Sequence, residues 1–157
     1  MSRVLMCKTP QGWLMPTDVA AGELMGKLRM GQDVWVDVVR ARSTAFHRKY
    51  FALLGIGFEA WEPAKITTGE HAGIRPEKDF ESFRKDVVKL CGFVDVNVSL
   101  DGSTMVTARS ISFERMGADE FERLYSETIN ILLKFVVRNK SEQQLRDWVD
   151  AVMRFDT

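Results

Sequence analysis

Hydrophobic and polar residues follow two different periods along this chain, and the periods divide it into strands and helices. Residues 33–39 (DVWVDVV) and 94–100 (VDVNVSL) carry apolar side chains at every second position, as a strand with one buried face does. Elsewhere, apolar residues return every three to four positions, as on one face of an α-helix. The predicted elements are strands at 3–7 and 13–15, a helix from 17 or 18 to about 30, a strand at 33–39, helices at 44–61 and 76–90, a hairpin at 93–113, and helices at 118–139 and 141–155.

Turn and cap residues support these boundaries. The segment Thr9-Pro10-Gln11-Gly12 is typical of a turn, and Asp101-Gly102 suits a hairpin turn because both residues tolerate positive φ. Ser43 is a favourable N-cap for the helix at 44–61. Ser141, with Gln144 three residues later, matches a capping box at the start of the last helix.

The element order β-β-α-β-α-α-β-β-α-α predicts an α+β fold. Because hairpins supply most of the strands, we expect a largely antiparallel sheet with four to five helices. The chain has 157 residues, of which 45% are hydrophobic, and this length and composition suit one domain spanning residues 1–157.

Composition argues against secretion and membrane insertion. Cys7 and Cys91 are too few and too far apart for a disulfide framework or a zinc site. The most apolar stretch, residues 129–137, is interrupted by Asn130 and Lys134 and is shorter than the roughly 20 residues that span a bilayer. The first ten residues lack the apolar core of a signal peptide. We therefore expect a cytoplasmic protein that does not contact membranes.

A basic cluster between residues 40 and 50 is the main candidate functional site. The whole chain has a net charge of zero, yet residues 1–57 hold eight Lys/Arg and four Asp/Glu, a local excess of +4. Part of this excess lies at the start of the helix at 44–61, where free backbone N–H groups and the helix dipole already favour anions. Cations placed there strengthen a field that attracts phosphate.

This cluster predicts a nucleic-acid-binding site, with single-stranded DNA favoured. Its basic side chains would contact phosphates, and an aromatic ring would stack on a base. The candidate residues are Arg40, Arg42, His47, Arg48, Lys49 and Tyr50. The competing hypothesis is that the cations form ordinary surface salt bridges. The carboxylates considered for those bridges are Asp33, Asp37, Glu59 and Glu62.

The sequence contains no recognisable catalytic, phosphate-loop or metal-binding motif, and we expect no cofactor. A weaker hypothesis is a metal-dependent nuclease built on His71 and nearby loop carboxylates. Those carboxylates are Glu59, Glu62, Glu70 and Glu77. His47 acting as a general base is a similarly weak hypothesis, and a histidine that is partly packed in the helix and hydrogen-bonded to a neighbour is the favoured interpretation.

Several motifs resemble a family of small proteins from tailed bacteriophages and prophages that is catalogued as a domain of unknown function. One is K-T-P-x-G at residues 8–12, and another is R-x-x-x-F-H-R-K-x-F-A-L-L at residues 42–54. The runs S-I-S-F at 110–113 and E-F-x-x-L-Y at 120–125 are also similar. The resemblance covers most of the chain and implies a phage or prophage origin.

A shorter segment is similar to the NinB (Orf) recombination mediators of lambdoid phages. The pair Arg42-Ser43, the pair Arg48-Lys49 and the A-x-L-G run at 52–55 follow the same spacing. Those proteins dimerise and bind single-stranded DNA, so the similarity implies an accessory role in recombination or replication. The alternative is a protein-interaction module, without nucleic-acid binding, that inhibits or modulates a host enzyme or defence complex. The apolar excess of the last two predicted helices also favours a homodimer.

Overall fold

The computed structural model describes residues 3–155. The chain divides into two compact units, Met1–Val38 and Val39–Thr157. The expectation of one domain over residues 1–157 stays a prediction. Helices and antiparallel hairpins occur together, which confirms the predicted α+β class.

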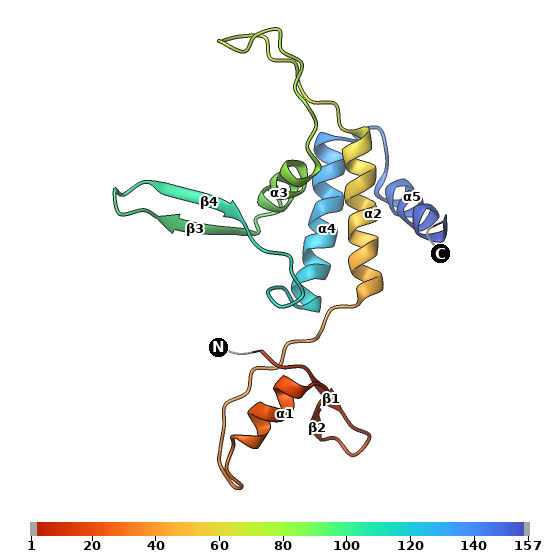
Figure 1. Ribbon diagram of the computed structural model, residues 1–157. Helices are drawn as coiled ribbons and strands as arrows, with labels where there is room; N and C mark the ends of the chain where they lie inside the picture. The colour runs from red at the N-terminus through yellow and green to blue at the C-terminus, as the bar shows by residue number, and fades with distance from the viewer. Residues whose placement is uncertain (1–2, 156–157) are drawn as a thin grey trace. The chain divides into compact units, whose positions relative to one another are not determined.

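The first unit holds a short hairpin and a helix (Figure 1). Strand β1 (Met6–Lys8) pairs antiparallel with β2 (Leu14–Pro16), and Cys7 lies opposite Met15. The turn between them closes where the Gly12 N–H donates to the Thr9 carbonyl at 2.9 Å, with Gly12 at φ 89°. Helix α1 (Val19–Gly26) starts at the Asp18 cap. The predicted turn and cap are therefore confirmed.

The second unit contains four helices and a second hairpin (Figure 1). Its elements are α2 (Thr44–Ala60), α3 (Phe80–Leu90), β3 (Val94–Val98), β4 (Thr104–Ala108), α4 (Ala118–Phe135) and α5 (Glu142–Phe155). Helices α2 and α4 lie side by side, and α3 and α5 flank this pair. The helices pack mainly against one another, while the β3–β4 hairpin contacts the unit through α3.

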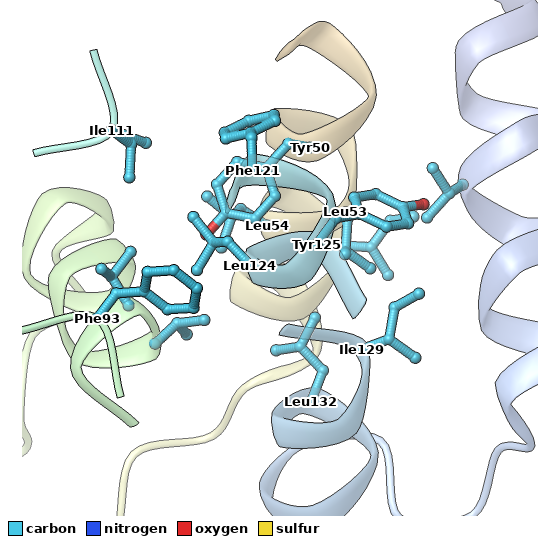
Figure 2. Packing of buried hydrophobic residues seen from close by; sticks show 14 of the residues in the cluster. Tyr50, Leu53, Leu54, Phe93, Ile111, Phe121, Leu124, Tyr125, Ile129 and Leu132 are labelled. Atoms are coloured by element: carbon cyan, nitrogen blue, oxygen red, sulfur yellow. The ribbon is translucent and has the colours of Figure 1, made fainter. Parts of the chain in front are cut away.

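Buried apolar side chains of these helices form the core of the second unit (Figure 2). Tyr50, Leu53 and Leu54 of α2 meet Phe121 and Leu124 of α4, and all five are fully buried. Burying one large apolar side chain stabilises a fold by about 1.5–3 kcal/mol. This core therefore fixes the start of α2, where the basic cluster lies.

Cap residues set most helix boundaries as the sequence predicts. The Ser43 hydroxyl accepts from the Phe46 N–H at the start of α2. Ser141 and Gln144 form the expected capping box, since each side chain accepts from the other residue's backbone N–H. Gly92, at φ 84°, ends α3 as predicted, because glycine adopts this left-handed conformation without steric cost.

The predicted strand at 33–39 does not form. Residues 32–43 contain no helix or strand, and each hairpin described in residues 3–155 pairs only its own two strands. An alternating pattern becomes a strand only when another strand supplies hydrogen-bonding partners. The observed order is therefore β-β-α-α-α-β-β-α-α.

Three predicted helix boundaries are also wrong. Helix α1 ends at Gly26 instead of continuing to about residue 30. Helix α3 begins at Phe80 rather than at Pro76, because the Asp79 carboxylate caps it by accepting from the Ser82 N–H at 2.7 Å. Helix α4 ends at Phe135 instead of continuing to residue 139.

Candidate functional site

Arg42 lies inside the second unit, where it joins the start of α2 to the segment before α4. Only 6% of its surface is exposed. Its Nη2 donates to the Ile111 carbonyl at 2.8 Å and lies 3.1 Å from Nδ1 of His47. Its guanidinium carbon is 4.1 Å from the ring centroid of Phe113 and 4.0 Å from that of Phe121. The side chain therefore acts as an internal anchor in this conformation.

The buried guanidinium of Arg42 is incompletely hydrogen-bonded. Its Nε and Nη1 atoms have no hydrogen-bond partner, and no carboxylate within residues 3–155 forms an ion pair with it. Burial lowers the pKa of Arg42, although a guanidinium stays protonated in proteins. The aromatic faces on which it lies stabilise the charge through cation–π attraction.

His47 is half-buried between aromatic rings. Its ring centroid lies 4.8 Å from those of Phe51 and Phe113 and 6.0 Å from that of Phe121. Burial lowers the pKa of His47, and the nearby positive charge of Arg42 lowers it further. Both effects favour the neutral imidazole, so this side chain contributes no positive charge to the cluster near neutral pH.

Arg40 is bound to the first turns of α4. Its Nη2 lies 2.7 Å from Oδ1 of Asp119 and 3.1 Å from Oε1 of Glu122, while 62% of its side chain is exposed. Its carbonyl accepts from the Ala118 N–H at 3.0 Å, which satisfies one of the free donors at the start of that helix. The pairs are exposed, so each is worth at most about 1 kcal/mol.

Lys49 and Tyr50 face α5 and α4. The Nζ atom of Lys49 lies 2.9 Å from Oδ1 of Asp150 and 5.9 Å from the ring centroid of Tyr125. Tyr50 is fully buried, and the Thr128 hydroxyl donates to its Oη at 3.4 Å. Burial raises the pKa of the Tyr50 hydroxyl. The ring is thus part of the core, where it cannot stack on a base.

The structure brings Arg42 and His47 together but does not gather the predicted cations on one open face. Arg48 is exposed on α2 and forms no ion pair among the residues that the structure describes. The carboxylates that bind the cluster come from α4 and α5 instead of the neighbouring sequence positions. They are Asp119, Glu122 and Asp150, in place of the expected Asp33, Asp37, Glu59 and Glu62. Helix packing, which local sequence does not reveal, chooses these partners.

Sequence reasoning missed the groups that surround Arg42. Ile111 and Phe113 precede α4, and Phe121 lies in its first turns. No periodicity links them to Arg42. Their runs, 110–113 and 120–125, nevertheless belong to the motifs that carry the family resemblance, and this was the available signal.

The β3–β4 hairpin presents a second candidate surface. In its register Val96 lies opposite Val106, and Val94, Val98 and Ala108 lie on the same face. Val96 is 58% exposed and Val106 is 51% exposed. We call this surface, made by Val94, Val96, Val98, Val106 and Ala108, the hairpin valine face. It is an apolar face that no part of residues 3–155 covers at its centre.

The described residues offer little for metal or thiol chemistry. Within residues 3–155, no three His, Cys, Asp or Glu side chains gather as a metal site would require. Burial raises the pKa of the Cys91 thiol to about 11, which disfavours the reactive thiolate. None of the helices in residues 3–155 combines the length and the apolar character that crossing a bilayer requires.

The chain belongs to the family described as Protein of unknown function (DUF1367), whose model matches residues 1–72 and 64–155. This agrees with the resemblance to a domain family of unknown function. Comparisons with curated proteins and with solved structures gave no match.

Proposed function

We propose that the protein is a phage- or prophage-encoded protein-binding module that modulates a host enzyme or defence complex. The observation that carries this proposal is the hairpin valine face, where Val96 and Val106 lie directly opposite each other and are more than half exposed. The phage origin rests on the sequence resemblance alone, and it implies action in the cytoplasm of the host cell.

The energetics of a two-stranded hairpin support this proposal. Such a hairpin is only marginally stable by itself, and its open edges offer unpaired N–H and C=O groups. A partner that covers the valine face removes apolar surface from water at roughly 25 cal/mol per Å². Leu100, at the hairpin tip and fully exposed, extends the apolar contact beyond the strands.

Affinity capture with matched variants tests the proposal. The tagged protein would be expressed in a bacterial host, and the Val96→Thr/Val106→Thr variant compared with Met105→Thr. Threonine keeps the branched shape and strand propensity of valine but adds a hydroxyl. Met105 is exposed on the opposite face of the same hairpin, so its replacement is the control.

The expected result is a stoichiometric host partner that the wild type and Met105→Thr retain and that the double variant loses by at least about tenfold, which corresponds to about 1.4 kcal/mol. Unchanged melting temperatures would show that all three proteins are folded. Equal capture by every variant, or no stoichiometric partner, would contradict the proposal.

A second candidate function is the binding of nucleic-acid backbone, single-stranded DNA above all, in recombination or replication. One observation favours it: α2 has no acidic residue in its first turn, and Arg48 is exposed there. Arg40 is also accessible, although its carboxylate partners compete with phosphate. The similarity to the NinB (Orf) mediators motivates this candidate.

Fluorescence anisotropy with labelled oligo-dT and its duplex, at low and at physiological salt, tests the second candidate. Backbone binding would weaken steeply with salt. Arg40→Ala/Arg48→Ala should weaken it, whereas Lys85→Ala/Lys89→Ala, which removes the same charge from α3, should not. Absence of binding at low salt, or equal losses in both variants, would contradict it.

A further inference from the structure

Residues 33–39 have the composition of a strand and no strand partner. Within residues 3–155, no backbone hydrogen bond joins this segment to any other residue. Its valines and tryptophan lie in water: Trp35 is 104% exposed, Val36 is 65% exposed and Val38 is 76% exposed. Valine and tryptophan favour strands because they pack well on a pleated surface. The segment therefore presents unpaired backbone N–H and C=O groups with which another strand can pair.

The pattern of side chains in this segment is complementary to itself. In an antiparallel pair, residues that lie opposite each other point to the same face. Pairing two copies about Val36 sets Val34 opposite Val38 and collects six valines on one face. A slip of one residue would mix the two faces and abolish that apolar surface.

Among the registers that keep the valines together, electrostatics favour this one. On the other face, pairing about Val36 sets Trp35 opposite Asp37 and Asp33 opposite Val39. Pairing about Trp35 would instead set Asp33 against Asp37, and pairing about Asp37 would set that residue against its own copy. Like charges directly opposite each other destabilise a strand pair. Among the registers that keep the valines on one face and pair most of the segment, only the one about Val36 avoids acid–acid pairs.

We propose that residues 33–39 bind a second copy of this chain, forming an antiparallel two-stranded ribbon with its two-fold axis at Val36. The contact is isologous, the commonest arrangement in protein dimers. It uses different residues from the hairpin valine face, so it goes beyond the proposed function and does not depend on it. Each copy supplies the hydrogen-bonding partners that the other lacks.

Site-specific disulfide trapping tests this register. Directly opposite residues in antiparallel strands have Cα atoms about 4.5–5.5 Å apart, and a disulfide spans about 4.4–6.8 Å. In a Cys7→Ser/Cys91→Ser background, Val36→Cys should give a disulfide dimer under mild oxidation. Val34→Cys alone should form no disulfide crosslink, but should crosslink when mixed with Val38→Cys. Leu100→Cys, fully exposed at the hairpin tip, controls for random collision.

Sedimentation equilibrium on the otherwise unchanged chain gives an independent readout. The wild type should be dimeric, and Val36→Pro should raise the dimer dissociation constant at least about tenfold, because proline cannot donate to a strand ladder. The Met105→Thr variant should dimerise normally. A monomeric wild type would overturn the proposal. So would crosslinking that is equal at all the cysteine positions, or stronger at Leu100→Cys than at Val36→Cys.

Discussion

The Nη2 atom of Arg42 lies 3.1 Å from Nδ1 of His47, at the point where the extended chain enters α2. A guanidinium has donors but no acceptor, so the imidazole nitrogen must accept. His47 is therefore neutral and carries its proton on Nε2. Two residues that the sequence presents as a pair of cations instead form a hydrogen-bonded pair with a single charge.

This pairing predicts a loss of stability at mildly acidic pH. The folded pKa of His47 is lowered by burial and by Arg42. As the pH falls through the ordinary histidine value of about 6.5, the unfolded chain binds a proton that the folded chain does not. The free energy of unfolding should therefore fall between about pH 7.5 and about pH 5.5.

Urea unfolding of variants at both pH values checks this prediction. His47→Gln should flatten the pH dependence, because it removes the titrating group. His71→Gln, which removes the other histidine of the chain from an exposed loop, should leave the dependence unchanged. An unaltered pH dependence in His47→Gln would show that other groups cause it.

Two replacements of Arg42 should distinguish the contribution of its packing to stability from the contribution of its charge. Methionine keeps an unbranched chain between Phe113 and Phe121 but removes a buried charge with two unpaired nitrogens. We expect the free energy of unfolding of Arg42→Met to differ from that of the wild type by at most about 1 kcal/mol. Arg42→Ala leaves a cavity and should lose about 2–4 kcal/mol. Chemical denaturation measures both, and equal losses would indicate that charge interactions dominate over packing.

Two glycines of α2 should respond in opposite directions to alanine. A Cβ atom at Gly57 would lie 2.6 Å from Cδ2 of the buried Leu132 and 3.3 Å from Cζ of Phe83. Gly57→Ala should therefore lower the melting temperature, with an overpacking cost of about 1–3 kcal/mol. Nothing lies within 4 Å of a Cβ at Gly55. Gly55→Ala should raise stability by about 0.5–1 kcal/mol through helix propensity. Stabilisation by both substitutions would contradict the close approach of α2 and α4.

The capping box at the start of α5 should contribute measurably to stability. Gln144 Oε1 accepts from the Ser141 N–H at 2.8 Å, and the Ser141 hydroxyl accepts from the Gln144 N–H at 3.2 Å. Ser141→Ala should lower the free energy of unfolding by about 1 kcal/mol. Ser141→Asp keeps a capping oxygen and should restore most of that loss. A loss of the same size in Ser141→Asp would argue against the cap.

Local signals in the sequence were sufficient for most of the secondary structure. Ser43, Asp18 and the Ser141–Gln144 pair start helices where they are expected to, because a cap satisfies backbone groups within its own turn. The predicted hairpin turns at Asp101-Gly102 for the same reason, since residues adjacent in sequence decide the turn, but its strands span only 94–98 and 104–108 and do not reach residue 113.

Only the tertiary structure decided the environment of the basic cluster. The sequence determined that cations crowd the start of α2, but the packing of α4 and α5 buried Arg42 and Tyr50 and brought Asp119, Glu122 and Asp150 to Arg40 and Lys49. The same limit applies to residues 33–39, whose alternation is a property of the chain but whose pairing needs a second strand. Propensity and capping act within a few residues, whereas burial and ion pairing depend on segments far apart in sequence.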